Sequence, residues 1–295
     1  MVKGRIGLSR GEAAFSLVNY FFLTLLMIVS LYPLLYVLFA AFSDPWKIMQ
    51  NRGPIFMPLG FSTAAFKEVF TNRSIYSGFL TTLINLVFGT SLNIFLTLLA
   101  AYGLSRKGFL FRNVLMFAIT FTMFFSGGMI PSFLLVKELK MYDTRLAMIL
   151  PTAISAFNMI ILRTAMLAVP DSLEESALLD GANDFVILFR IIMPLVGATI
   201  AVLVLYYGVM HWNQWYQALL YIQDRDKYPL QLVLREILIS NSLDQMVTPV
   251  DSNVEPIEQT IKYATIIVTT VPILTIYPFL QKYFVKGVMI GAIKG

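Results

Sequence analysis

The sequence contains no cysteine and only one histidine, His211, among its 295 residues. Disulfide frameworks, thiol chemistry and multi-histidine metal sites are therefore excluded. The sequence also lacks a Gly-x-x-x-x-Gly-Lys-Ser/Thr phosphate loop, so we do not expect this chain to hydrolyse ATP itself. No nucleophile or carboxylate lies beside His211 in the sequence, which makes it a poor candidate for acid–base catalysis.

Charged residues are scarce as well. They make up 13% of the chain, whereas hydrophobic residues make up 58% and the mean hydropathy is +0.74. A water-soluble domain of this length is normally far less apolar. The net charge of +5 is spread over loops and tails, which indicates contact with anionic lipid rather than a nucleic-acid-binding face. Strand-type alternation is absent, so we expect an all-α membrane protein.

The apolar residues fall into runs of about 20 or more, long enough to cross a ~30 Å hydrocarbon core as helices. The first run is too long for a signal-peptide core, and we expect it to remain a membrane anchor. Several prolines lie within or beside the runs, where they predict kinks. We predict one transmembrane domain over residues 1–295, with six spans at residues 15–42, 77–104, 114–136, 146–169, 195–217 and 261–283.

The connections between the spans differ in character. Residues 105–113 form a short basic turn typical of a cytoplasmic connection, and two long polar loops, residues 43–76 and 221–260, lie on the opposite face. Apolar residues spaced along residues 228–238 predict a short amphipathic helix that lies on the membrane, on a partner or on its own bundle. Arg163, near the inner end of the fourth span, is interpreted as a snorkelling side chain.

The most informative segment is the connection of residues 170–194, which is charged and amphipathic. Ser172 and Glu175 have the Ser-x-x-Glu spacing of a capping box, which predicts a helix of residues 173–180. Gly181 then occupies the position where a left-handed residue commonly ends a helix, and Asn183 can cap the next one. We therefore predict a helix, a sharp turn and a second helix, with an apolar face that suits a groove on another protein.

These residues resemble the cytoplasmic EAA signature of ABC-importer permeases, which is Glu-Ala-Ala, three residues, Gly, nine residues and Ile-x-Leu-Pro. Here the matching residues are Glu175-Ser176-Ala177, Gly181 and Ile191-Ile192-Met193-Pro194, with Ser176 and Met193 as the two departures. Tyr32-Pro33-Leu34, Trp212-Asn213 and the glycine-rich carboxyl end extend the resemblance along nearly the full length. The sequence is most similar to the MalG/LplC/YtcP-like group of carbohydrate permeases, which includes permeases for alginate or pectin oligosaccharides.

The resemblance implies a type I ABC-importer (MetI-like) fold, with both termini on the cytoplasmic side of a bacterial cytoplasmic membrane. It implies a second permease subunit, a dimer of ATPase subunits that bind ATP and Mg, and an external solute-binding protein, with no cofactor in this chain. It also implies that residues 170–194 form a coupling loop that docks on the ATPase, with Glu175 bonded to a basic ATPase residue. The residues expected to couple to the ATPase are Leu173, Glu174, Glu175, Ser176, Ala177, Asp180, Gly181, Ala182 and Asn183, with Gly291 and Lys294 at the carboxyl end.

Polar and aromatic groups within the spans are candidates for the substrate pathway, because amides and ring faces suit sugar hydroxyls and sugar rings. Helix-to-helix hydrogen bonding and an interfacial aromatic belt are equally plausible roles for them. The candidates are Asn85, Asn158, Tyr206, His211, Trp212, Asn213 and Trp215.

Two other classes of protein were weighed. An ion-coupled secondary transporter would need intramembrane carboxylates or inverted repeats, and a membrane-embedded enzyme would need clustered His, Cys or acidic residues. The predicted spans lack Asp and Glu at their centres. We therefore expect a transporter subunit that is not an enzyme, with the ion-coupled transporter as the alternative.

Overall fold

A computed structural model describes residues 10–51, 53–247 and 260–275, and the described residues are helical throughout apart from turns, bends and one isolated bridge between Ser43 and Phe61. The chain divides into two compact units, residues 1–71 with 240–268, and residues 72–239 with 269–295. We describe each unit separately. The second unit contains the predicted coupling loop.

The first unit begins with α1 (Arg10–Ala41), a 32-residue helix that continues through Pro33. Its hydrophobic side chains are almost all exposed, as expected for a helix surrounded by lipid or by a partner subunit. Two short helices follow, α2 (Pro45–Gln50) and α3 (Ala64–Thr71). Asp44 caps α2 by accepting hydrogen bonds from two backbone N–H groups at its start.

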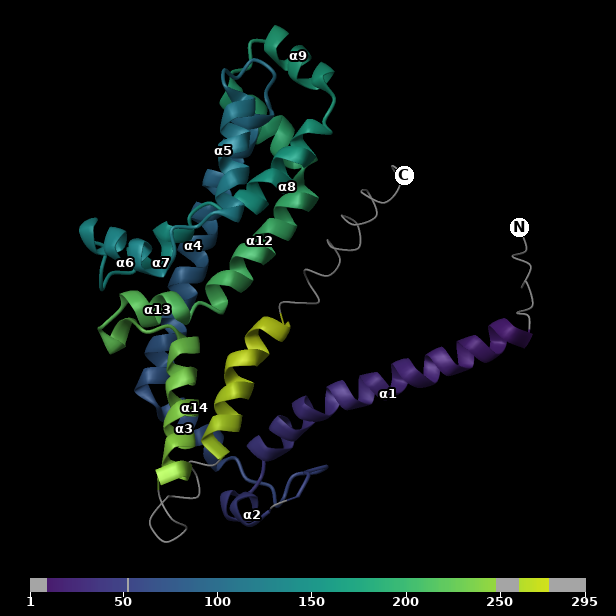
Figure 1. Ribbon diagram of the computed structural model, residues 1–295, viewed down its shortest axis with the longest axis vertical. Coiled ribbons are helices and arrows are strands. Elements are labelled where there is room, and N and C mark those ends of the chain that lie inside the picture. The colour runs from purple at the N-terminus through teal and green to yellow at the C-terminus, as the bar shows by residue number, and fades with distance from the viewer. Residues whose placement is uncertain (1–9, 52, 248–259, 276–295) are drawn as a thin grey trace. The chain divides into compact units, whose positions relative to one another are not determined.

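The second unit is built on α4 (Arg73–Ser105), a 33-residue helix whose start is capped by Asn72. α4 packs against α8 (Ala156–Leu167) and α12 (Gly197–Trp212) (Figure 1). Their shared core lies toward the carboxyl end of α4 and includes Leu98, Leu162, Met166 and Leu203. Arg163 donates a hydrogen bond to the Leu104 carbonyl at 2.8 Å, so it satisfies a free backbone acceptor at the end of α4.

Two of the predicted spans, residues 114–136 and 146–169, are bent pairs of helices, and a third bend lies at the start of the predicted span of residues 195–217. α5 (Arg112–Phe124) and α6 (Met129–Glu138) meet at 116°, α7 (Leu146–Ile149) with η1 (Leu150–Thr152) meets α8 at 50°, and residues 184–195 meet α12 at 86°. Two described helices are long and apolar enough to cross a membrane alone, and counting each bent pair as one span raises the number to five. A further apolar helix covers Thr260–Thr275.

The other end of the second unit contains α13 (Tyr216–Tyr221), η3 (Arg225–Lys227) and residues 230–239 of α14 (Leu230–Val247). α14 confirms the predicted amphipathic helix. Its first turns pack on their own bundle, because Leu230 and Leu232 are fully buried and the Leu230 N–H donates to Thr82 Oγ1 at 2.9 Å. Nearby, the Asp224 backbone N–H donates a hydrogen bond to Asp143 Oδ1 at 3.1 Å, which ties the loop of residues 140–145 to this end. The same hydrogen bond holds the pKa of Asp143 below its usual value.

Candidate coupling site and substrate pathway

The predicted coupling helix is α9 (Asp171–Leu179), at one end of the second unit (Figure 1). It begins two residues earlier than predicted. Its N-cap is Pro170, and no side chain caps its first turn, so the predicted capping box between Ser172 and Glu175 is wrong. Because the proline ring already fixes the backbone angle at the helix entry, the helix starts before Ser172, which lies inside the first turn.

The turn after α9 confirms the predicted left-handed glycine. Gly181 has a φ of +80°, its N–H donates to the Leu178 carbonyl at 3.0 Å, and the Ala182 N–H donates to the Ala177 carbonyl at 2.9 Å. This pair of hydrogen bonds is the Schellman motif, which satisfies carbonyls left free at the helix end. Gly181 is required here because a side chain strains a backbone with this φ.

The second half of the elbow starts at Asn183, whose Oδ1 accepts a hydrogen bond from the Val186 N–H at 2.9 Å, as predicted. It continues through α10 (Asp184–Val186), the π-helix η2 (Ile187–Ile192) and α11 (Met193–Leu195). Ile187, Leu188 and Ile192 are buried in the shared core of α4, α8 and α12. Residues 184–195 therefore anchor the elbow in the bundle, whereas α9 projects from it.

Two ion pairs attach α9 to the turn that follows α4. Arg106 pairs with Glu174, and Lys107 pairs with Asp171. The first pair is half-buried, with side chains 20% and 19% exposed, and the Arg106 guanidinium also lies 4.8 Å from the centre of the Tyr102 ring. The second pair is exposed, and its hydrogen bond raises the pKa of Lys107 and lowers that of Asp171. Sequence reasoning identified Arg106 and Lys107 only as topology signals and missed this contact.

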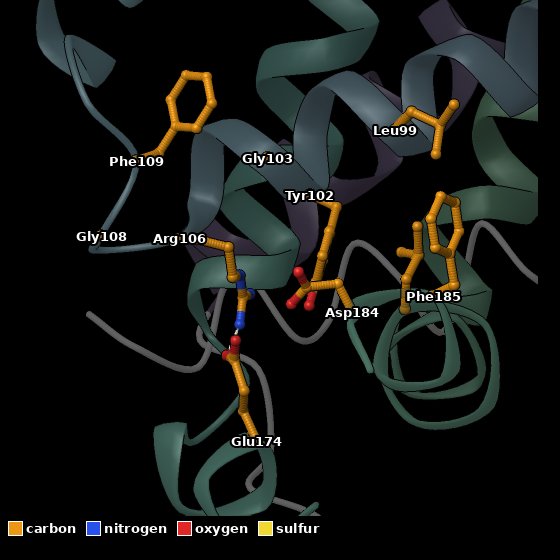
Figure 2. Close-up of a pocket in the computed structure, with 10 residues that line it drawn as sticks. Leu99, Tyr102, Gly103, Arg106, Gly108, Phe109, Glu174, Asp184 and Phe185 are labelled. Atoms are coloured by element: carbon orange, nitrogen blue, oxygen red, sulfur yellow. Dashed lines mark ion pairs between the residues drawn. The ribbon is translucent and has the colours of Figure 1, made fainter. Parts of the chain in front are cut away.

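A pocket of about 450 Å³ lies beside the Arg106–Glu174 pair. Figure 2 shows Arg106 reaching Glu174 across one side of it and Asp184 pointing toward Tyr102. Leu99, Phe109, Phe185 and Leu188 supply its apolar lining. The coupling helix is thus held against α4 by charge at one edge of a cavity rather than by close packing throughout.

The structure separates the predicted coupling residues into two groups. Glu175, Ser176, Asp180, Gly181 and Asn183 are exposed, together with the large apolar side chains of Leu173, Leu178 and Leu179. Ala177 is buried in the bundle's own core, so the prediction that it belongs to the partner-facing surface is wrong. Glu174 faces inward to Arg106, whereas Glu175 forms no ion pair with any described residue.

The structure also separates the candidates for the substrate pathway. Asn85, Asn158, His211 and Trp212 are buried, and no open surface is available to them in this structure. Tyr206 and Trp215, 40% and 37% exposed, and the exposed Asn213 remain accessible. Tyr206 and Val209 lie about one turn apart on α12, and Asn213 follows directly at the end of that helix.

The buried side chains form a hydrogen-bond network around the break between η1 and α8. His211 Nε2 lies 2.7 Å from Asn93 Oδ1, and the Asn93 amide donates to the Thr152 and Ala153 carbonyls at 2.7 and 2.8 Å. Because the Asn93 nitrogen donates twice, its oxygen is the acceptor and His211 Nε2 carries the proton. The only histidine is therefore a structural group that helps to satisfy backbone carbonyls freed by the break.

The two predicted carboxyl-terminal contacts, Gly291 and Lys294, lie outside the described residues. Among the residues that the structure describes, no three His, Cys, Asp or Glu side chains are grouped so that they could hold a metal ion.

A helical membrane bundle with an exposed EAA-spaced elbow, turned at a left-handed glycine, defines the class of ABC-importer permease subunits. The chain belongs to the family of the binding-protein-dependent transport system inner membrane component, which matches residues 93–290. It is thus a transporter subunit of the inner membrane and not an enzyme.

Related proteins agree with this assignment. The chain is 43% identical to the polygalacturonan/rhamnogalacturonan transport system permease protein YtcP of Bacillus subtilis, over 95% of this chain and 98% of the relative. It is 40% identical to protein LplC of the same organism, over 97% of each chain. A solved bacterial ABC transporter involved in the import of the acidic polysaccharide alginate matches with a TM-score of 0.86 and 29% identity, over 94% of this chain and 99% of that one.

Proposed function

We propose that this chain forms one half of a translocation pathway for an oligosaccharide that contains uronic acids, and that α9 couples the pathway to a partner ATPase. The exposed elbow of α9 and Gly181 is the observation that carries the coupling role. The similarity to permeases of polygalacturonan and alginate transport supports the substrate class, because both polymers carry a carboxylate on their sugar rings. The ion-coupled alternative gains no support from these relatives.

The partners proposed for the complex are a second permease that is a different, homologous chain, two ATPase subunits and an external solute-binding protein. A single bundle of this size cannot enclose a sugar-sized path, which supports the second permease. Binding and hydrolysis of ATP with Mg are assigned to the ATPase subunits. The cytoplasmic position of α9 and of both termini is also part of the proposal.

Glu175 is proposed to contact a basic residue of the ATPase. It is exposed, whereas the adjacent Glu174 is already paired with Arg106. Leu173, Leu178 and Leu179 supply exposed apolar area around it, as a helix that docks in a groove requires. When the ATPase subunits close, the elbow moves with them, and the bundle shifts between two states through differential contacts.

The test is uptake of trigalacturonate by proteoliposomes that contain the complete complex, with its binding protein and with or without ATP. We expect uptake only with ATP. Uptake by this chain without any nucleotide-hydrolysing subunit would refute the proposal, and ATP-dependent uptake of neutral sugars alone would refute the substrate class.

Two variants test the elbow in the same assay. Gly181→Leu is expected to insert normally but to separate ATP hydrolysis from uptake, because leucine strains the left-handed turn. Glu175→Gln is expected to lower uptake roughly ten- to hundredfold, from the loss of a charge-assisted hydrogen bond of ~1.5–3 kcal/mol. Asp226→Asn, an equal change of charge at the other end of the unit, is the control and should leave uptake unchanged. Intact uptake by Gly181→Leu would contradict the assignment of the elbow.

A further inference from the structure

An arginine lies on an indole ring at the end of the second unit remote from α9. The Arg235 guanidinium, on α14, is 4.7 Å from the centre of the Trp215 ring, which follows the end of α12. Trp215 is 37% exposed, and its ring meets that of Tyr216, itself 43% exposed, edge to face at 5.6 Å. A cation and two accessible aromatic rings are thus brought together by segments about 20 residues apart in the sequence.

The charges around Arg235 leave its guanidinium available. The adjacent acid, Glu236, pairs instead with Arg225 at 3.6 Å, and within the described part of the chain no carboxylate forms an ion pair with Arg235. A guanidinium placed over an indole ring can keep N–H donors free at its edge, and those donors match a carboxylate in bidentate geometry. The stack also removes conformational freedom from the long side chain before any ligand binds.

The location fits a site at the outer mouth of the pathway. Trp215 and Tyr216 are exposed just past the end of α12, next to the exposed Asn213. Tyr216 is held in place because its hydroxyl donates to Met129 Sδ at 2.9 Å, which ties α13 to α6. The aromatic pair is therefore fixed on two elements, while Arg235 comes from a third.

We infer that Arg235 and Trp215 form a subsite for the uronate ring of a sugar, with the guanidinium edge on the ring carboxylate and the aromatic rings against the C–H face of the sugar. This inference rests on the proposed function and adds which group of the substrate the chain recognises. An anionic lipid headgroup offers a similar acceptor, so the experiment includes an arm for lipid.

The experiment measures the kinetics of trigalacturonate uptake by the complete complex in phosphatidylcholine proteoliposomes. We expect Arg235→Gln to lower kcat/KM at least tenfold, the effect of losing a charge-assisted hydrogen bond. Arg235→Lys, which keeps the charge but not the planar fork, should give an intermediate loss. Arg145→Gln removes an equal charge from an exposed arginine at the same end of the unit and should change kcat/KM less than twofold.

A second readout separates recognition from a structural role. Trigalacturonate should alter the fluorescence of Trp215 in a complex whose other two tryptophans in this chain are phenylalanine, and the methyl ester of the same sugar should not. A merely structural arginine would make no distinction between acid and ester. Arg235→Gln should abolish the response to the acid.

Three results would overturn the subsite. They are an unchanged kcat/KM for both Arg235 variants, equal fluorescence responses to acid and ester, or an Arg235→Gln defect that appears only when anionic lipid is present, which would make Arg235 a lipid anchor. In each case wild-type uptake of trigalacturonate would continue. Failure of the proposed function is distinguishable, because the wild-type complex itself would not take up the sugar.

Discussion

Gly89 and His211 show how one residue type can be dictated by a neighbour 122 positions away in the chain. A Cβ atom on Gly89 would lie 2.4 Å from His211 Nε2, inside the van der Waals limit. The imidazole cannot move aside freely, because it is fully buried and its Nε2 donates to Asn93, which in turn holds the Thr152 and Ala153 carbonyls. Glycine is the one residue that lets α4 and α12 approach this closely.

Gly89→Ala is therefore expected to destabilise the protein by about 1–3 kcal/mol, the usual range for overpacking a well-packed interior. The measurement is thermal unfolding of the purified complex in detergent. Gly103→Ala is the matched control on the same helix, because nothing lies within 4 Å of a Cβ there. That control should be neutral or slightly stabilising, since alanine favours a helix. Equal melting temperatures for the two variants would contradict this account of the contact.

At the level of helices, the main finding is the attachment of α9 to the end of α4. The Arg106–Glu174 pair is shielded on both sides, whereas the Lys107–Asp171 pair, with side chains 79% and 56% exposed, is open to solvent. Exposed pairs contribute little because water and salt screen them. Movement of α9 should therefore pass to α4, which packs on α8 and α12, mainly through Arg106 and Glu174.

Reversing the half-buried pair tests this transmission. Arg106→Glu and Glu174→Arg should each reduce the ATPase stimulation caused by loaded binding protein, because each places like charges together. The double variant should recover part of the stimulation, with a coupling of about 1 kcal/mol in the double-mutant cycle. Lys107→Gln is the control and should have a small effect that vanishes at high salt. Additive single effects would show that the pair does not transmit the movement.

For the molecule as a whole, orientation in the membrane follows from the two ends of the second unit. α9 lies at one end, and α13 and α14 lie at the other (Figure 1). If α9 meets an ATPase in the cytoplasm, the turn of residues 224–227 faces outward. The absence of cysteine makes this directly testable, because any introduced thiol is the only one in the chain.

Leu179→Cys and Asp226→Cys are suitable probes, since Leu179 is 88% exposed on α9 and Asp226 is exposed in η3. A membrane-impermeant maleimide is added to cells whose cytoplasmic membrane is intact but whose outer envelope is made permeable to the reagent. It should label Asp226→Cys and leave Leu179→Cys unlabelled. Lysis should make Leu179→Cys reactive. Labelling in the reverse order would contradict the proposed orientation.

The class of protein and the shape of the elbow were accessible from the sequence because both depend on local information. Long apolar runs require helices in a bilayer, and the conformations of Gly181 and Asn183 are set by their own backbone preferences. The capping box failed for an equally local reason, since Pro170 starts α9 before Ser172.

Tertiary structure alone decided which faces of the helices are buried. The spans are apolar on all sides, so no periodic pattern distinguished the buried His211 and Trp212 from the exposed Tyr206 and Trp215. Glu174 is paired while Glu175 is exposed, and this difference likewise depends on Arg106, 68 residues away from Glu174 in the chain. Contacts at such separations arise only when packing brings distant helices together, and local sequence carries no record of them.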